Sequence, residues 1–225
     1  LPWRRRRTPY RVWVAEIMLQ QTRADTVADY FPRFLRRFPT LQALAQAPRA
    51  DVLKAWEGLG YYSRARRLHE TAIRLVRDRG GRLPQTLEEL RALPGVGAYT
   101  AAAIGSLAFG LDAAAVDGNI ARVLARLAAL PGDPREPAVR RRIQALADSI
   151  LVPGRAGECN EALMELGATL CAPRAPRCAE CPLQAVCAAH ARGQTGLYPQ
   201  RRPRRRVPHK VVGAAVTLNR RGAVL

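Results

Sequence analysis

Nearly every segment of the chain has the mixed apolar and polar pattern of a helix, and proline or glycine separates one segment from the next. Thr8 followed by Pro9 is a helix start signal, because a capping hydroxyl precedes proline at the first helical position. The pattern predicts an all-α fold. The expected helices are Tyr10–Thr22, Thr26–Arg37, Thr40–Gln46, Ala50–Trp56, Ser63–Arg79, Thr86–Ala92, Ala98–Phe109, Ile120–Leu130, Ala138–Ile150 and Cys159–Leu170.

The end of the chain has a different pattern. No acidic residue occurs from Ala188 onward, and residues 201–206 form a basic stretch broken by proline. The apolar run Val211–Val216 then predicts a β-strand, the first in the chain. Since the chain lacks an initiator methionine and stops inside an apolar stretch, we expect both ends to be trimmed and a second domain to begin here.

The charge points to nucleic acid. The chain of 225 residues carries a formal net charge of +19, almost all of it from arginine. Arginine binds phosphate through two parallel hydrogen bonds and stacks on bases. A GC-rich genome explains the preference for arginine over lysine, but it does not explain the shortage of acids. No apolar run is long enough to cross a membrane.

Four of the five cysteines form a tight array with the spacing C-x6-C-x2-C-x5-C, and they are Cys171, Cys178, Cys181 and Cys187. Four thiolates in so short a span can surround one metal centre, which favours a reducing compartment over a disulfide framework. Structural zinc sites usually have two close cysteine pairs, and only Cys178 and Cys181 form one. The spacing therefore favours an iron–sulfur cluster, with zinc as the alternative. Cys159 lies outside the array and is interpreted as a buried free thiol.

A glycine-rich turn, Leu93–Gly97, precedes a helix of small residues. Its glycines allow a tight turn, and the turn exposes amide N–H groups just ahead of a helix N-terminus, which is a favourable site for a phosphate group. The turn predicts the hairpin of a helix-hairpin-helix element, although any connection between helices can use such a turn.

Two carboxylates have the surroundings of catalytic groups. Asp117 lies in a Val-Asp-Gly-Asn turn, where the alternative role is a helix N-cap. Glu16 lies in an apolar helix beside Trp13 and Ile17, where partial burial raises the pKa of a carboxyl group. The alternative for Glu16 is a solvated helix face.

Several motifs together resemble the bacterial MutY-type adenine DNA glycosylases over residues 1 to 210. They occur in the expected order, and the combination is highly specific. The matching segments are Trp13–Thr22, Trp56–Arg66, Leu93–Ala101, Val116–Asn119 and the cysteine array.

The resemblance implies the helix-hairpin-helix DNA glycosylase fold. It places a six-helix module at 8–113, an iron–sulfur module at 1–7 and 114–198, a basic linker at 199–210, and the first strand of a truncated Nudix-like domain at 211–225. It also implies a [4Fe-4S] cluster on the four cysteines.

The implied reaction is hydrolysis of the N-glycosidic bond of adenine opposite 8-oxoguanine or guanine in double-stranded DNA, as a step of base excision repair. Glu16 would protonate adenine at N7, and ionised Asp117 would stabilise the cationic sugar or trap it. Tyr99 and Asn119 would support this site by hydrogen bonds.

The resemblance assigns further residues to the substrate. Those expected to line the adenine pocket are Trp3, Arg4, Leu19 and Glu161, although Trp3 and Leu19 are also consistent with core positions. Those expected to contact DNA, including the tyrosine wedge beside the opposite base, are Gln20, Gln21, Thr22, Leu59, Tyr61, Gly95, Val96 and Gly97. For Tyr61, the alternative is simple packing under the glycine turn. At least one of Arg64, Arg66 and Arg67 is expected to contact a DNA phosphate, and the alternative for these arginines is a solvated helix face.

The endonuclease III-type glycosylase-lyases share the fold, hairpin and cluster. They carry a Schiff-base lysine where this chain has Tyr99, which cannot form an imine. The sequence therefore favours a glycosylase without lyase activity over this alternative and over a non-catalytic iron–sulfur protein that only binds DNA. We expect a monomer in the bacterial cytoplasm, associated with the nucleoid through its DNA.

Overall fold

The computed structural model describes residues 1–200, 202, 211–218, 220 and 221. Within these ranges the regular secondary structure is helical, so the predicted all-α fold is confirmed. The α-helices are α1 (Pro9–Leu19), α2 (Ala24–Arg37), α3 (Leu41–Gln46), α4 (Arg49–Ala55), α5 (Ser63–Arg79), α6 (Leu87–Arg91), α7 (Ala98–Phe109), α8 (Gly118–Leu127), α9 (Pro137–Ser149), α10 (Ala156–Thr169) and α11 (Ala188–Ala191).

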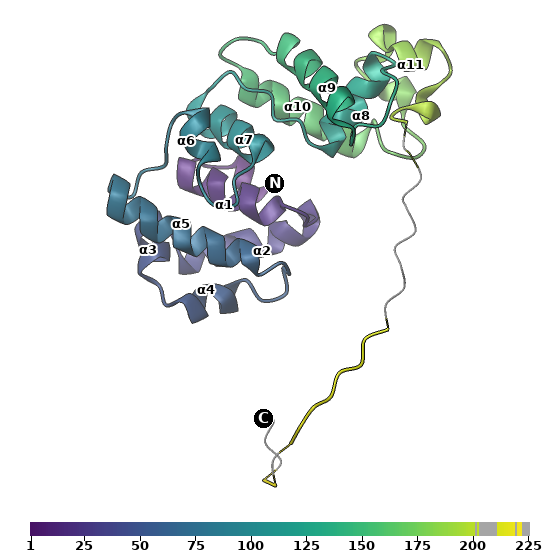
Figure 1. Cartoon of the computed structure of the whole chain (residues 1–225). Helices are drawn as coiled ribbons and strands as arrows, with labels where there is room; N and C mark the ends of the chain where they lie inside the picture. Colours follow the sequence, from purple (N-terminus) through teal and green to yellow (C-terminus); the bar gives the residue numbers. More distant parts are fainter. Residues whose placement is uncertain (201, 203–210, 219, 222–225) are drawn as a thin grey trace.

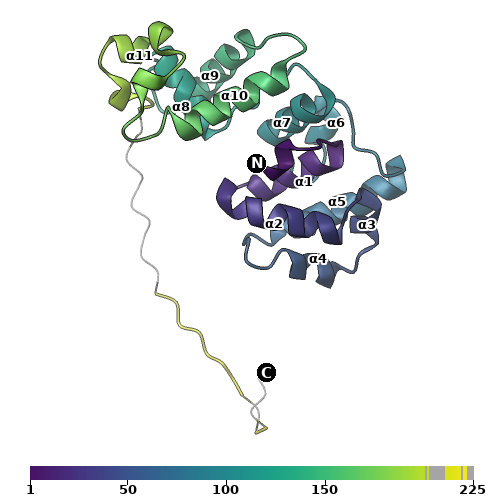
Figure 2. The ribbon, with the colours of Figure 1, turned by 180° about the vertical axis from the view of Figure 1, so that it is seen from behind.

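The helices form two groups, with α1–α7 on one side and α8–α11 on the other, in both views (Figures 1 and 2). Each group has its own apolar core. The larger core surrounds Trp13, Phe31 and Trp56, and the smaller one surrounds Leu124 and Ile143. A cleft between two packed groups is a common position for a ligand site. The exact boundaries of the expected modules stay a prediction.

The predicted helices agree with the structure in position, and α5 and α7 begin and end where the sequence indicated. The first helix ends at Leu19 rather than at Thr22. Gln21 has a φ of 58°, a left-handed conformation that stops the helix. The last carbonyl groups of α1 bond instead to the buried guanidinium of Arg64.

The strand predicted at Val211–Val216 is wrong for this structure, because residues 211–217 carry no regular secondary structure. Their apolar side chains are exposed, and Val211 is 88% exposed. A strand needs a neighbouring strand for its hydrogen bonds, and the described part of the chain provides none. The rest of the basic linker, residues 201 and 203–210, and residues 219 and 222–225 of the expected Nudix-like segment lie outside the described residues.

The first residues of the chain connect the two groups of helices. Trp3, in a short 3₁₀ helix (Pro2–Arg4), packs its ring against the edge of Phe31 in α2, with 6.0 Å between ring centroids. The neighbouring Arg4 forms an ion pair of 2.8 Å with Glu165 in α10. This segment therefore covers one side of the contact between the groups.

Helix α10 fixes the start of α8. Gly167 of α10 packs directly on Asn119, since a Cβ atom at this glycine would lie 2.6 Å from the Cβ of Asn119. Asn160, which is buried, accepts a hydrogen bond from the Ala115 N–H and donates one to the Ala113 carbonyl. The connection that leads to Asp117 is therefore held at a fixed place. Among the described residues, no helix is long and apolar enough to span a membrane.

Candidate active site

A cavity of about 1410 Å³ lies between the two groups of helices. It is lined by residues of α1, α7, α8, α9 and α10 and by the loops before and after them. Of the residues expected in the site, those that line it are Trp3, Arg4, Glu16, Leu19, Gln20, Gln21, Thr22, Tyr61, Tyr99, Asp117, Asn119 and Glu161. The structure thus brings together side chains that are far apart in the sequence.

Glu16 is a buried acid in this cavity. Its side chain is on α1, is 5% exposed, and its Oε2 atom has no hydrogen-bond partner among the described residues. Burial raises the pKa of Glu16 to about 7, the hydrogen bond from Tyr99 opposes this effect, and the charges of Asp117 and Glu161 add to it. Glu16 is therefore protonated in a substantial fraction of molecules at neutral pH, and it can act as an acid. The solvated helix face considered for this residue is wrong.

Asp117 is both an N-cap and a cavity residue. Its side chain accepts hydrogen bonds from the Ile120 N–H at 2.7 Å and from the Asn119 side-chain amide at 3.0 Å. Burial raises the pKa of Asp117, and these hydrogen bonds and the charge of Arg122 oppose the rise. Each of these donors favours the ionised carboxylate. The cavity therefore contains two carboxyl groups in different surroundings, which is the arrangement of an acid and an anionic stabiliser.

A chain of hydrogen bonds connects Asp117 with the cysteine array. Asn119 donates to Asp117 and accepts from the Arg122 guanidinium at 2.9 Å. The Arg122 side chain also donates to the Cys171 carbonyl at 2.8 Å. The position of the carboxylate therefore depends on the fold of the cysteine loop.

The four cysteines of the array are close together. Burial raises the pKa of Cys178, and the neighbouring thiols of Cys171, Cys187 and Cys181 add to the rise. In the described part of the chain, no group of three or more His, Cys, Asp or Glu side chains is arranged to hold a metal ion. The structure brings the four thiols of the array close together, which a zinc ion and an iron–sulfur cluster both require.

Arg126 of α8 is a second buried arginine at the array. Its side chain is 3% exposed, and it donates to the Cys171 sulfur at 3.3 Å and to the Ala172 carbonyl at 2.7 Å. It also donates to the Tyr198 carbonyl at 3.0 Å, so it joins both ends of the cysteine loop. A cation at this position favours an anionic group among the thiols.

Leu59 and the hairpin do not line the cavity. The Leu59 side chain is buried in the larger core. In the hairpin, Gly95 has a φ of 83°, which permits the turn, and its carbonyl accepts a hydrogen bond from the Gln20 side chain at 3.0 Å. Val96 is buried, and the space beside Gly97 is open at the start of α7. The hairpin is therefore a turn with an accessible backbone, and its contact with DNA stays a prediction.

Arg64 holds the loop that carries Tyr61. It is buried, so the solvated face considered for it is wrong, and its guanidinium donates to carbonyl groups of Met18 at 2.7 Å and Leu59 at 3.2 Å. It also donates to the Thr22 hydroxyl at 2.9 Å and lies over the Tyr61 ring. Tyr61 itself is 59% exposed with a φ of 50°. An exposed aromatic ring on a strained and fixed loop is typical of a binding element.

Replacing Arg64 with Met should release this loop. We expect the free energy of unfolding to fall by several kcal/mol, because each buried carbonyl left without a donor costs about 1–3 kcal/mol. Urea unfolding measures the change. Arg66→Met, on the exposed side of the same helix, is the matched control and should have a much smaller effect. Equal stability of the two variants would contradict the role given to Arg64.

Two buried arginines of the site were not identified from the sequence, Arg122 and Arg126. Both are on α8, four residues apart, in a helix that is otherwise apolar on that side. Two arginines four residues apart on one helix face were the available signal in the sequence. Because a buried guanidinium group requires several acceptors, such a pair indicates a polar network around the helix.

The comparisons with known proteins agree on one family. Residues 14–148 match the family described as HhH-GPD superfamily base excision DNA repair protein. The adenine DNA glycosylase of Homo sapiens is 48% identical over 201 residues, covering 85% of this chain and 37% of the relative. That of Buchnera aphidicola subsp. Baizongia pistaciae is 37% identical, with 84% of this chain and 54% of the relative covered. The chain therefore spans only part of these curated relatives.

Solved structures have the same fold. A thermostable thymine-DNA glycosylase superposes with a TM-score of 0.77 at 32% identity, covering 85% of this chain and 88% of the other. Endonuclease III in a non-covalent DNA complex superposes with a TM-score of 0.71 at 24% identity, covering 83% and 86%, and this likeness concerns the fold alone.

Proposed function

The chain belongs to the HhH-GPD superfamily of base excision DNA repair proteins, and from this premise we propose that it hydrolyses the N-glycosidic bond of adenine opposite 8-oxoguanine or guanine in duplex DNA. The observation that carries the proposal is that two carboxyl groups lie in one cavity in different surroundings. Glu16 is buried and its Oε2 atom has no partner among the described residues, whereas Asp117 accepts hydrogen bonds from the Ile120 N–H and the Asn119 amide. The names of the curated relatives support adenine as the base.

Adenine has to leave the base stack before its bond to the sugar can break, and the cavity of about 1410 Å³ has room for a flipped nucleotide. In our proposal the Glu16 carboxyl donates its proton to N7 of adenine. Protonation turns the base into a better leaving group, since the cationic ring takes the electron pair of the broken bond and leaves as neutral adenine. Trp3, Leu19, Arg4 and Glu161 would enclose the base.

Asp117 has the opposite role. Cleavage of the bond leaves a cationic sugar, and an ionised carboxylate beside it stabilises this charge or forms a transient bond to it. The hydrogen bonds from Asn119 and Ile120 hold the carboxylate in its anionic form and fix its direction. Water then completes the hydrolysis.

The pH dependence follows from these two groups. In the reacting form Glu16 is protonated and Asp117 is ionised. The rate should therefore fall as pH rises through about 7, where Glu16 loses its proton. It should also fall in acid, where the Asp117 carboxylate becomes protonated. The hydrogen bond from Tyr99 lowers the pKa of Glu16, so Tyr99→Phe should raise it and move the alkaline limb to higher pH. Single-turnover rates at a series of pH values measure the limb. A shift to lower pH would mean that Tyr99 acts in another way.

The lyase alternative requires an amine that attacks the sugar. The residue at the position of that amine is Tyr99, and the pKa of its hydroxyl is raised well above its usual value by burial and by the charge of Glu16. A neutral phenol cannot form an imine, so we propose hydrolysis without strand cleavage. Tyr61, on the loop fixed by Arg64, would fill the space left in the base stack, and Gln20, Gln21 and Thr22 would lie beside the opposite base.

We propose that Cys171, Cys178, Cys181 and Cys187 hold a [4Fe-4S] cluster, for which the proximity of the thiols and the buried cation of Arg126 are the support. When bound, the cluster supplies a covalent staple of the cysteine loop. Through Arg122, that loop supports Asn119 and Asp117. The monomeric state, the cytoplasmic location and the boundaries of the two modules also remain proposals.

Replacing Cys181 with Ser should prevent stable assembly of the cluster. We expect loss of most of the bound iron, loss of visible absorption and a markedly lower melting temperature, because the loop then lacks its staple. Cys159→Ser, a cysteine outside the array, is the matched control and should keep the iron content unchanged. Iron and sulfide analysis of the purified variants measures this. One zinc ion in place of iron in the parent protein, or an unchanged iron content in Cys181→Ser, would contradict the cluster.

The substrate can be tested by release of free adenine. Duplexes with a single adenine opposite 8-oxoguanine, guanine or thymine are incubated with the protein, and the free base is measured by chromatography. We expect release from the first two and none from the adenine–thymine duplex. Release of another base, or equal release from all three duplexes, would refute the proposed substrate.

A further inference from the structure

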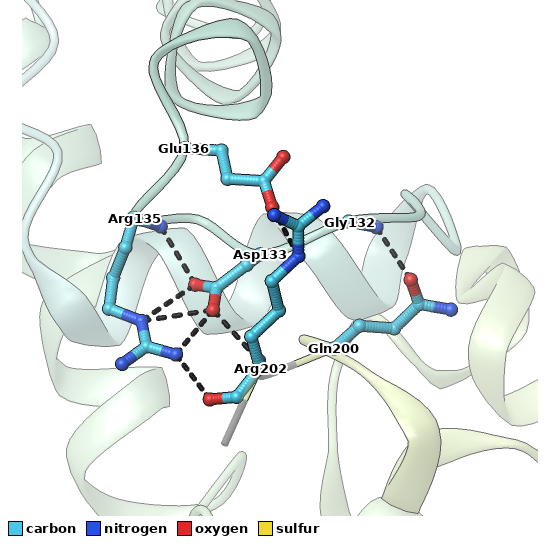
Figure 3. A network of polar contacts seen from close by, with 6 residues as sticks. All are labelled: Gly132, Asp133, Arg135, Glu136, Gln200 and Arg202. Carbon is cyan, nitrogen blue, oxygen red and sulfur yellow. Dashed lines mark hydrogen bonds and ion pairs between the residues drawn. The ribbon is translucent and has the colours of Figure 1, made fainter. Parts of the chain in front are cut away.

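A network of polar contacts joins the loop between α8 and α9 to the chain that follows α11 (Figure 3). We name this network the clasp. Its members are Gly132, Asp133, Arg135, Glu136, Gln200 and Arg202.

The clasp holds the main chain at two points. The Gly132 N–H donates to the Gln200 side-chain oxygen at 2.8 Å, and the Arg202 N–H donates to the Asp133 carboxylate at 3.0 Å. The Arg135 guanidinium also donates to the Arg202 carbonyl at 2.7 Å. Residues 200 and 202 are therefore held against the loop by both backbone groups of Arg202 and by the side chain of Gln200.

Asp133 is the centre of the clasp. It is 4% exposed and accepts hydrogen bonds from the Arg135 N–H and Nε, both at 2.9 Å. These bonds, followed by that from the Arg202 N–H, hold the pKa of Asp133 far below its usual range. Asp133 therefore connects Arg135 of the loop with the backbone of Arg202, and the hold on Arg202 depends on this one side chain.

The clasp lies at the cavity of the proposed active site. Asp133, Arg135 and Arg202 line that cavity together with Glu16 and Asp117. Arg140, which follows the same loop on α9, lines the cavity as well.

The guanidinium groups at this edge remain accessible. The side chains of Arg135 and Arg202 are 53% and 79% exposed. The Arg202 guanidinium forms an ion pair of 2.9 Å with Glu136 at the surface. Surface ion pairs are weak, so a phosphate group can displace the Glu136 carboxylate.

We propose that Asp133 clasps residues 200 and 202 to the 132–136 loop and thereby assembles a phosphate-binding rim of Arg135, Arg140 and Arg202 at the mouth of the cavity. The ligand is a phosphate of the DNA backbone, and in this respect the inference rests on the proposed function. The rim is composite, because one of its arginines comes from the chain that leaves the helical body. Asp133 acts as a positioning residue and does not contact the DNA.

The direction in which DNA affinity changes in Asp133→Asn distinguishes the proposed rim from a simple effect of charge. Replacing Asp133 with Asn removes a negative charge beside a polyanion, so charge alone predicts tighter binding. If the clasp assembles the rim, the variant instead loses the positions of Arg135 and Arg202 and binds more weakly. The matched control is Glu136→Gln, which removes the same charge from the same loop but frees Arg202 for phosphate, and it should bind equally or more tightly.

The measurement is the affinity for an undamaged duplex at several salt concentrations. The slope of log K against log[salt] changes by about 0.9 for each phosphate contact, so we expect Asp133→Asn to reduce it by about 1.8 and Glu136→Gln to leave it unchanged. Tighter binding by Asp133→Asn, or an unchanged slope, would overturn the rim.

Limited trypsin digestion tests the clasp by itself. The bond after Arg201 lies between the two held residues, and it should be cut slowly in the wild-type chain and rapidly in Asp133→Asn. The bond after Arg192 is the internal reference for general unfolding. Continued protection of the first bond in Asp133→Asn would overturn the role of Asp133. Neither experiment depends on adenine release. If the protein releases no adenine but gives the expected binding and digestion results, the proposed reaction is refuted and the phosphate-binding rim is supported.

Discussion

Adenine release in a single turnover should fall by about 10²–10⁴-fold when Glu16 is replaced by Gln, the range that a positioned general acid contributes. Glutamine has nearly the same shape as protonated glutamic acid, so the buried position on α1 is preserved. Its amide is too weak an acid to protonate a ring nitrogen. Because the affected step follows base binding, affinity for the mispaired duplex should stay within a few-fold of that of the parent protein.

The control for this substitution is Glu158→Gln, which removes an exposed carboxylate of α10 that does not line the cavity. Excision by this variant should equal that of the parent protein. If Glu16→Gln loses DNA binding together with excision, Glu16 is a structural residue, and the proposed acid has to be sought elsewhere in the cavity.

Replacing Asp117 with Asn should lower the rate of excision by about 10²–10³-fold, as removal of a group that stabilises a developing charge does. Asparagine is also an effective N-cap, so α8 should begin at the same residue. Above neutral pH, the rate of Asp117→Asn should fall further, because Glu16 in this variant loses its proton at a lower pH. The charge of Asp117 raises the pKa of Glu16, so its removal should move the alkaline limb to lower pH.

Asp148→Asn, a change on α9 outside the cavity, is the matched control and should have neither effect. Full activity of Asp117→Asn would refute the role of the carboxylate as an anion. A large loss of thermal stability in the same variant would instead identify Asp117 as a cap alone.

The sequence predicted those parts of the fold that depend on local signals. Proline, glycine and capping hydroxyls mark the ends of most helices. Thr8 accepts the expected hydrogen bond from the helix that follows, and Thr40 and Thr86 cap their helices in the same way. The sequence surroundings of Glu16 and Asp117, one apolar and one in a turn, made them candidates, and the family resemblance supplied their expected roles.

Contacts between distant segments could not be predicted in this way. The end of α1 depends on Arg64, which is 45 residues beyond Leu19 and has no local signal of burial. The link from Asp117 to Cys171 depends on Arg122, and the clasp depends on Asp133. In each case a charged side chain is buried and hydrogen-bonds to backbone groups of a segment that is distant in the sequence.

The strand expected at Val211–Val216 shows that a local pattern alone does not produce a strand. Its composition is that of a strand, but a strand exists only as part of a sheet, and no neighbouring strand is present in the described chain. The local pattern was insufficient there, whereas the helices form their own hydrogen bonds.

The most direct test of the account is a single-turnover incubation with a duplex that contains one adenine opposite 8-oxoguanine, with half of each sample heated in alkali before separation. A two-carboxylate site without an attacking amine predicts strand cleavage only in the heated half, because hydrolysis leaves an intact strand with an abasic sugar. Cleavage in the unheated half would contradict the account and indicate a lyase. Absence of cleavage in both halves, with tight binding, would contradict it as well and indicate a protein that only binds DNA.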